Sequence, residues 1–259
     1  MKNRCITLTL ILLFLITTGV AAQPLTFTGT GINPASGKSL SAQADFEALA
    51  GKLVVTLSNT SNDDVVIPSD VLTGVFFSLN GVSPLTPVYA EINPNPTGVN
   101  TVVYGNYPTK GMVGGWWAFE ALPSGPGGAT MGISSAGLGL FGAGNFTGDG
   151  STSHPVKGLD WGLTSMGDKP DTGNGGVDKQ PLIMYSVVFT LSGLPYEGTD
   201  LVGKITDVSF QYGTGLDEPN IPEGGGGGGG FETVPEPGTF VLFGMGLAGL
   251  AVIRRRRNR

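Results

Sequence analysis

The chain has little of the chemistry on which many active sites depend. Among its 259 residues there is one cysteine, Cys5, and one histidine, His154. These counts exclude an intramolecular disulfide, a metal held by several thiolates and a site built from several histidines. We therefore expect no cofactor, and we expect a folded part of about 200 residues to depend on its hydrophobic core.

Arginine is also missing from most of the chain, since none occurs between Gln23 and Pro237. That interior holds seven lysines and all 20 acidic residues, which gives it a net charge of −13. A surface of this charge repels phosphate backbones, and it lacks the side chain best suited to bidentate phosphate contacts. We therefore expect no nucleic-acid partner.

Glycine and proline, by contrast, are abundant, with 44 and 18 residues. Both weaken helix interiors and favour turns, so the composition predicts an all-β fold of short strands. Alternating apolar and polar residues predict one domain at 23–222, an antiparallel β-sandwich of jelly-roll or immunoglobulin-like type. The strand candidates are 25–29, 41–49, 52–59, 71–79, 113–121, 182–191 and 205–212, with a further one at 136–143.

A secretory signal peptide is predicted at 1–22. Lys2 and Arg4 form its positive start, an apolar run of fifteen residues follows, and small residues precede a cleavage site between Ala22 and Gln23. This pattern predicts export through the Sec translocon. The alternative is a permanent N-terminal anchor, but the apolar run is short for a membrane span.

The C-terminus carries four ordered elements that suit a membrane-bound sorting signal. Two prolines keep the chain extended and present a defined peptide ahead of an apolar stretch. That stretch would be about 22 Å long as a helix, against a hydrocarbon core of about 30 Å, so it predicts a marginal single transmembrane helix. The arginines that follow predict a cytoplasmic end. In order, the elements are a glycine-rich linker (223–233), Val234, Pro235, Glu236 and Pro237, the apolar stretch (239–253), and Arg254, Arg255, Arg256 and Arg257.

The tail at 234–259 resembles the PEP-CTERM sorting tail of exosortase-dependent proteins. The resemblance implies that a membrane-embedded exosortase recognises Pro235, Glu236 and Pro237 while the tail is transiently in the inner membrane. It further implies removal of the tail and release or attachment at the cell surface. Such proteins occur in Gram-negative bacteria that make extracellular polysaccharide. The alternative is an ordinary single-pass anchor that is never processed.

Two adjacent tryptophans, Trp116 and Trp117, lie in the strand predicted at 113–121. Neighbouring strand residues point to opposite faces, so one indole is expected in the core and the other near the surface. An exposed indole with Trp161 or Tyr107 nearby could stack on a sugar ring, which makes Trp116, Trp117 and Trp161 candidate glycan contacts. In the alternative both indoles are packed, as large aromatic side chains mostly are.

An oxygen-rich segment offers a candidate calcium site. Asp168, Asp171, Asn174 and Asp178 could gather ligands in a flexible loop. Their spacing is not that of an EF-hand, and stretches of this kind are more often plain turns.

The single histidine offers little for catalysis. His154 has serines beside it and Asp160 nearby, as a Ser-His-Asp triad would need. No nucleophile-elbow motif accompanies it, so we expect a solvated loop histidine.

Two classes of function remain. The first is a non-catalytic surface or matrix protein associated with exopolysaccharide or biofilm. The second is an exported hydrolase that acts on polysaccharide through a pair of carboxylates, although no sequence pattern singles out such a pair. The lack of a catalytic constellation favours the first class, so the chain is not expected to be an enzyme.

Overall fold

The computed structural model describes residues 23–82, 85–93, 102–195 and 201–225. The predicted signal peptide at 1–22 and the sorting tail at 234–259 lie outside these ranges. Within them the chain is built from β-strands and short 3₁₀ turns, and no helix there is long and apolar enough to cross a membrane. The 3₁₀ turns are η1 (Pro68–Asp70), η2 (Thr109–Gly111), η3 (Gly114–Trp116) and η4 (Pro126–Gly128).

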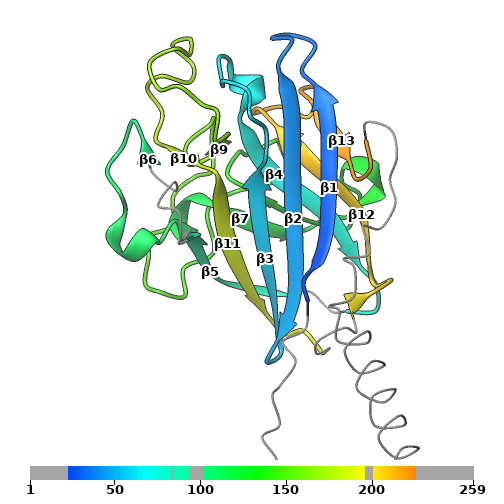
Figure 1. The fold of residues 1–259 in the computed structure, drawn as a ribbon. Helices are drawn as coiled ribbons and strands as arrows, with labels where there is room; N and C mark the ends of the chain where they lie inside the picture. The colour runs from blue at the N-terminus through cyan, green and yellow to red at the C-terminus, as the bar shows by residue number, and fades with distance from the viewer. Residues whose placement is uncertain (1–22, 83–84, 94–101, 196–200, 226–259) are drawn as a thin grey trace, which may run out of the picture.

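The first sheet has five strands, all antiparallel, and forms the near face in Figure 1. Its first three strands follow one another as hairpins, and two later strands complete the sheet on one side. In spatial order the strands are β1 (Leu25–Ile32), β2 (Ser39–Leu49), β3 (Lys52–Asn59), β11 (Ser186–Ser192) and β5 (Thr86–Ile92).

The second sheet has eight strands, mostly short, and lies behind the first in Figure 1. Its pairs are antiparallel except for β9 and β10, which run parallel. The all-β prediction is confirmed, while a jelly-roll or immunoglobulin-like type stays a prediction. The strands are β13 (Asn220–Pro222), β12 (Ile205–Tyr212), β4 (Leu72–Leu79), β9 (Leu163–Thr164), β10 (Leu182–Met184) and β6 (Val102–Val103), with β8 (Met131–Ser134) joining β4 to β7 (Ala118–Ala121).

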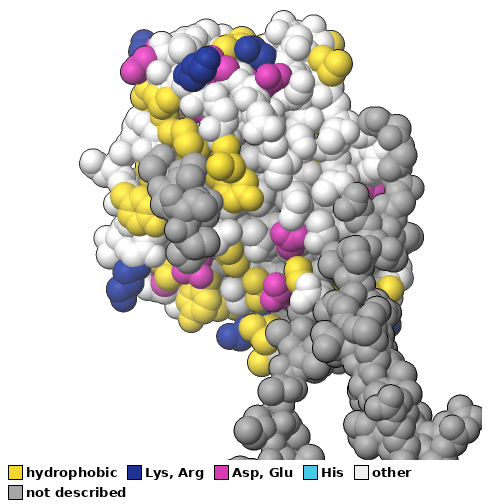
Figure 2. Space-filling view, viewed as in Figure 1, with side chains coloured by type: hydrophobic (Ala, Val, Ile, Leu, Met, Phe, Trp, Pro, Cys, Tyr) yellow, Lys and Arg dark blue, Asp and Glu magenta, His cyan; other side chains and the backbone are white. Residues whose placement is uncertain are grey.

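The alternation of side chains along the first sheet decides which of its faces meets the core. In β2, the side chains of Ala44 and Phe46 are buried, whereas those of Gln43, Asp45 and Glu47, which alternate with them, point outward. The outward face in this sheet is therefore polar but holds few charges. Figure 2 shows this face as mostly uncharged surface with scattered charged side chains.

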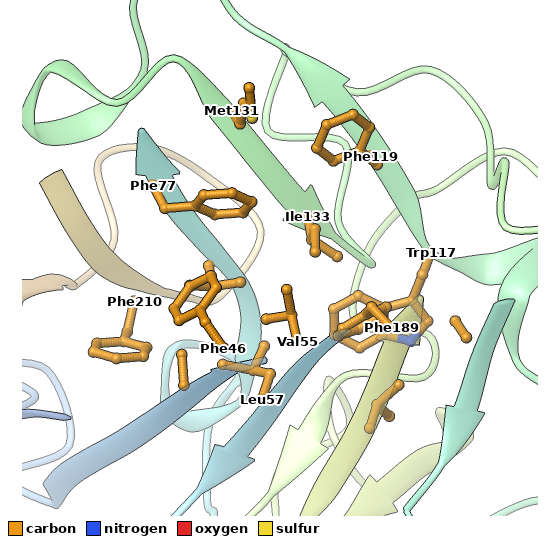
Figure 3. Close-up of a cluster of buried hydrophobic side chains, with 14 of the residues drawn as sticks. Phe46, Val55, Leu57, Phe77, Trp117, Phe119, Met131, Ile133, Phe189 and Phe210 are labelled. Atoms are coloured by element: carbon orange, nitrogen blue, oxygen red, sulfur yellow. The ribbon is translucent and has the colours of Figure 1, made fainter. Parts of the chain in front are cut away.

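A shared hydrophobic core joins the two sheets. The rings of Phe46 on β2 and Phe77 on β4 meet edge to face with centroids 5.2 Å apart. Trp117 packs against Phe189 of β11 at 4.9 Å. Figure 3 shows Phe46, Phe77 and Phe189 on strands of the two sheets, with Trp117, just before β7, beside Phe189. The sheets thus form two packed layers.

The second sheet is covered on its outer face as well. Every residue of β4 is buried, because one face meets the shared core and the other meets loops. A smaller apolar cluster under these loops includes Phe76 of β4 and Phe141, whose ring centroids are 6.0 Å apart. The segment 123–180, most of which forms loops, supplies much of this cover.

Three strand predictions need correction. The strand predicted at 113–121 begins only at Ala118, because the residues before it fold into η3. The strand predicted at 182–191 is broken at Tyr185, whose φ of +92° separates β10 from β11. No strand forms at 136–143, where Leu138 and Gly139 have φ of +51° and +71° and turn the chain.

The end of the described chain closes one edge of the molecule. After β13 the chain runs beside β1, where the Gly224 amide donates to the Thr28 carbonyl and the Thr30 amide donates to the Gly225 carbonyl, both at 2.9 Å. The first residues of the predicted glycine-rich linker at 223–233 are therefore hydrogen-bonded to the first strand.

Candidate functional site

A groove of about 850 Å³ opens beside the edge strand β5. One side is formed by the loop that contains η2, and the other by the loop that leads to His154. Four aromatic residues and several polar ones face it, a composition typical of sites that bind small polar ligands or chains of them. The lining residues are Tyr89, Asn106, Tyr107, Pro108, Thr109, Lys110, Met112, Trp116, Asp149, Gly150, Ser151, Thr152, His154 and Trp161.

The two adjacent tryptophans are divided between core and groove. Trp117 is fully buried against Phe189, while Trp116 is half-buried and lines the groove. Trp117 is thus a core residue and Trp116 is only partly accessible, and this division arises at the end of a 3₁₀ turn and not within a strand. The prediction that Trp117 contacts a glycan was wrong, because its side chain has no accessible surface.

The groove wall contains a stack of three rings from distant parts of the sequence. The imidazole of His154 lies parallel to the indole of Trp116, with centroids 4.7 Å apart and planes 8° apart. The indole of Trp161 lies 4.7 Å from Trp116 and is tilted by 34°. His154 is thus half-buried against an aromatic ring, and not the freely solvated histidine that we expected.

Glycines allow the two segments that carry this stack to approach closely. A Cβ on Gly115 would lie 2.0 Å from the Thr152 carbonyl oxygen, and one on Gly144 would lie 2.0 Å from the Gly115 carbonyl oxygen. Through this contact the His154 amide donates to the Gly115 carbonyl, and the Gly144 amide donates to the His154 carbonyl, both at 2.8 Å. Backbone hydrogen bonds therefore fix the imidazole beside Trp116.

The groove also contains residues in a strained backbone conformation. Trp161 has φ of +65° and Lys110 has φ of +56°, values at which a side chain other than that of glycine costs about 1–2 kcal/mol. The Trp161 amide donates to the Pro181 carbonyl, which holds this conformation in place. Strain of this kind is concentrated at functional sites, and here it orients an indole toward the stack.

The electrostatics of the groove centre on Asp149. Its Oδ1 accepts hydrogen bonds from the Ser151 amide, at 2.9 Å, and from the Ser151 hydroxyl. Burial by itself would raise the pKa of Asp149, but these hydrogen bonds and the charge of Lys110 outweigh it and hold the pKa below its ordinary value. The Ser151 hydroxyl donates to Asp149 and not to His154, so it is not placed as the nucleophile of a Ser-His-Asp triad, and Asp160 does not line the groove.

The candidate calcium residues lie in the loop at 168–178, away from the groove. Asp168 accepts from the Val65 amide, Asn174 accepts from the Gly176 amide, and Asp171 is exposed. No group of three or more His, Cys, Asp or Glu side chains is placed to hold a metal ion in the part of the chain that the structure describes. Asp168, Asp171 and Asp178 therefore do not converge as a ligand set, because the loop is organised by its own turns.

Two carboxylates near this loop do interact. Burial raises the pKa of Asp168, and the neighbouring charge of Asp64 raises it further. Asp64 in turn accepts hydrogen bonds from the Lys169 amide and the Thr172 hydroxyl. Neither Asp64 nor Asp168 lines the groove.

Sequence reasoning missed several groove residues. Tyr89 is 36% exposed on β5, a strand that was not predicted, whereas Tyr107, which was considered as a neighbour of an exposed indole, is 57% exposed on the opposite loop. Asp149, Lys110 and Ser151 belong to no motif. They meet only because the loops pack against β5, where Gly148 donates to the Val88 carbonyl at 2.8 Å. No local pattern marks such a meeting.

Comparison with known proteins identifies the C-terminus. A family model for the PEP-CTERM protein-sorting motif matches residues 233–257, which contain the Pro235-Glu236-Pro237 peptide and the arginine cluster. No curated protein and no solved structure matches the chain. The motif implies an exosortase as processing partner and sorting to the cell surface. The chain thus carries a β-sheet domain with an aromatic groove, followed by a PEP-CTERM protein-sorting motif.

Proposed function

We propose that this chain is a surface protein that binds extracellular polysaccharide in its groove without cleaving it. The observation that carries the proposal is the combination of exposed aromatic rings and polar groups in one groove. Tyr107 and Tyr89 are the most exposed aromatic residues of the groove, and Trp116, the central ring of the stack, is partly accessible. Flat rings accept the apolar faces of sugars, while hydroxyl, amide and carboxylate groups accept or donate hydrogen bonds to sugar hydroxyls.

The rigid parts of the groove suit binding. The ring stack holds Trp116 before a ligand arrives, and the backbone hydrogen bonds that His154 donates to Gly115 and accepts from Gly144 fix the stacked imidazole, so little side-chain freedom is lost on binding. Tyrosines have only two side-chain torsions and add contact area at low entropic cost.

The electrostatics favour binding over hydrolysis. A glycosidase needs two carboxyl groups beside the scissile bond, one of which has a raised pKa so that it can donate a proton. Among the described residues that line the groove, Asp149 is the single carboxylate, and its pKa is lowered. A group of this kind accepts hydrogen bonds and is a poor proton donor.

Export and sorting would bring the groove to its ligand. In this proposal the Sec translocon exports the chain, the signal peptide is removed between Ala22 and Gln23, and the tail at 239–253 enters the inner membrane only transiently. Exosortase then removes the tail near Pro235–Pro237. The folded domain would remain at the cell surface or in the surrounding matrix, with biofilm exopolysaccharide as its partner.

The test is affinity electrophoresis of the exported protein through gels that contain soluble polysaccharides. We expect retardation by at least one polysaccharide, with a loss of about tenfold or more in affinity for Tyr107→Ala, as expected for a central aromatic contact. Leu49→Ala removes an apolar side chain that is 59% exposed and lies outside the groove, so it serves as the control and should bind normally. Equal binding by both variants would contradict the proposal.

The hydrolase alternative rests on Asp64 and Asp168. The two carboxylates are close enough to interact, and the pKa of Asp168 is raised, as it is for the general acid in the carboxylate pair of a glycosidase. A reducing-sugar assay distinguishes the two functions. Release of sugar that is abolished by Asp168→Asn but not by Tyr107→Ala would favour the hydrolase, while binding without release supports the proposed function.

A further inference from the structure

We infer that the groove selects an uncharged glycan and that Asp149 is the residue that excludes polymers of uronic acid. This inference rests on the proposed function and assigns a ligand class to the same groove. Asp149 lies on the groove lining with Lys110 and the Ser151 hydroxyl. Its carboxylate is therefore one of the charges that any bound chain would meet.

The carboxylate is held in a fixed position with one side available. The amide and the hydroxyl of Ser151 both donate to Oδ1. Within the described residues, no group donates a hydrogen bond to the second carboxylate oxygen, Oδ2. An ionised carboxylate can only accept hydrogen bonds. Sugar hydroxyls can donate to it, whereas a uronate carboxylate would meet a like charge.

Lys110 does not reverse this preference. It is an exposed cation near enough to Asp149 to influence it, so the two charges largely offset each other in the groove. The wider field comes from the chain between 23 and 237, whose net charge is −13. A polyanion approaching the groove is repelled by this field, while a neutral glycan is not.

Removing the carboxylate should change the selectivity. In Asp149→Asn, the positive charge of Lys110 is no longer offset by a carboxylate. A uronate-bearing chain should therefore bind about fivefold more tightly, which is the effect expected from removing one like charge about 5 Å away in water. A neutral chain should bind about fivefold more weakly, because a charge-assisted hydrogen bond becomes a neutral one. Opposite changes for the two ligand classes are the signature of this role.

Asp171→Asn is the matched control. It removes the same unit of charge from an exposed site outside the groove, and asparagine tolerates its φ of +76°. It should leave both affinities nearly unchanged at moderate salt, since Asp171 does not line the groove and salt screens an exposed charge. Equal effects of the two variants would show that only net charge matters and would overturn the assignment of Asp149.

The experiment measures binding of the exported protein to neutral polymers, namely a soluble β-glucan, xylan and mannan, and to the uronates alginate and polygalacturonate. We expect binding to at least one neutral polymer, weak dependence on salt, and opposite changes in Asp149→Asn. Preferential binding of the wild-type protein to uronates would overturn this inference but leave the proposed function intact. Binding to no polysaccharide of either class would contradict the proposed function itself.

Discussion

The hairpins at 25–59 and the loops at 106–161 are ordered by different means. The hairpins form three consecutive antiparallel strands, in which backbone ladders and alternating side chains agree. The loops contain only short strands and depend on glycine contacts and single hydrogen bonds. Of the eight non-glycine residues with positive φ in the described chain, three lie in these loops and one, Ala50, lies in the hairpins. More of the strained residues thus lie in the loops that build the groove than in the hairpins.

This difference separates stability from binding. The hairpins and the core they cover can supply the free energy that holds strained loops in place. The loops in turn place Trp116, Trp161 and His154 together, although they are far apart in sequence. The adjacent pair Trp116 and Trp117 lies on the boundary between the two regions, so substitutions there test the separation most strongly.

The largest effect on stability is expected from Trp117→Ala. This change removes a fully buried indole from the core between the sheets and should lower the free energy of unfolding by about 3–5 kcal/mol. Trp116→Ala should cost less, because that side chain is half-buried at the groove. Denaturant unfolding of both variants measures the difference. Equal losses would show that core and groove are not separate.

A smaller but still large effect is expected from Gly114→Ala. A Cβ at this position would lie 1.7 Å from the Phe146 carbonyl oxygen, so the two loop segments would have to move apart, at a cost of about 3 kcal/mol. Gly142→Ala in the same region meets no atom within 4 Å and is the matched control. Thermal unfolding should separate the two variants clearly. A stable Gly114→Ala protein would contradict the close packing of the loops.

An intermediate effect is expected where the end of the domain pairs with β1. Gly224→Pro removes the amide that donates to Thr28 and cannot adopt the φ of +67°, so it should cost about 1–2 kcal/mol. Gly224→Ala keeps the amide and should cost about 1 kcal/mol for its left-handed backbone. Hydrogen exchange of the Thr30 amide reports on the pairing. Protection that survives Gly224→Pro would show that this segment does not close the edge.

The smallest effects are expected from the two carboxylates whose pKa values move in opposite directions. The pKa of Asp168 is raised, so its contribution to stability is present below the unfolded pKa and is lost as pH rises through the folded pKa. The pKa of Asp149 is lowered, so its contribution is present above the unfolded pKa and is lost as pH falls through the folded pKa.

At pH 7, Asp168→Asn should therefore be slightly more stable than the wild-type protein, and Asp149→Asn slightly less stable. The difference for Asp168→Asn should vanish as the pH falls below the unfolded pKa, and the difference for Asp149→Asn should shrink as the pH falls toward the lowered folded pKa of Asp149. Melting temperatures of the three proteins between pH 3 and pH 7 test this. Differences of the same sign for both variants would contradict the environments described for these groups.

The same comparison explains how much of the molecule could be predicted. The strands at 52–59 and 205–212 were predicted with their observed bounds. In 52–59 the apolar and polar residues alternate locally, as a half-buried strand requires. The strand β5 was missed, since Pro87 argues against a strand unless it lies at an edge. The sorting tail was also recognisable, because its signal consists of consecutive residues.

The groove could be predicted only in part. One indole of the tryptophan pair was expected near the surface with Trp161 or Tyr107 beside it, and all three line the groove with Trp116 as that indole. The contribution of His154 and Asp149 depends on how glycine-lined loops pack, and a single sequence carries no periodic signal for that packing. The strained φ of Trp161 likewise opposes its intrinsic preference and arises from tertiary structure.

The most direct test of the central claim follows the indole N–H signals of the three tryptophans by nuclear magnetic resonance. They are assigned with Trp→Phe variants, and the polysaccharide that retards the protein in gels is then added as soluble oligosaccharide. We expect the signal of Trp116 to shift with saturation while that of Trp117 stays in place. A shift of Trp117 alone, or no shift of Trp116 at saturating ligand, would contradict a binding site in this groove.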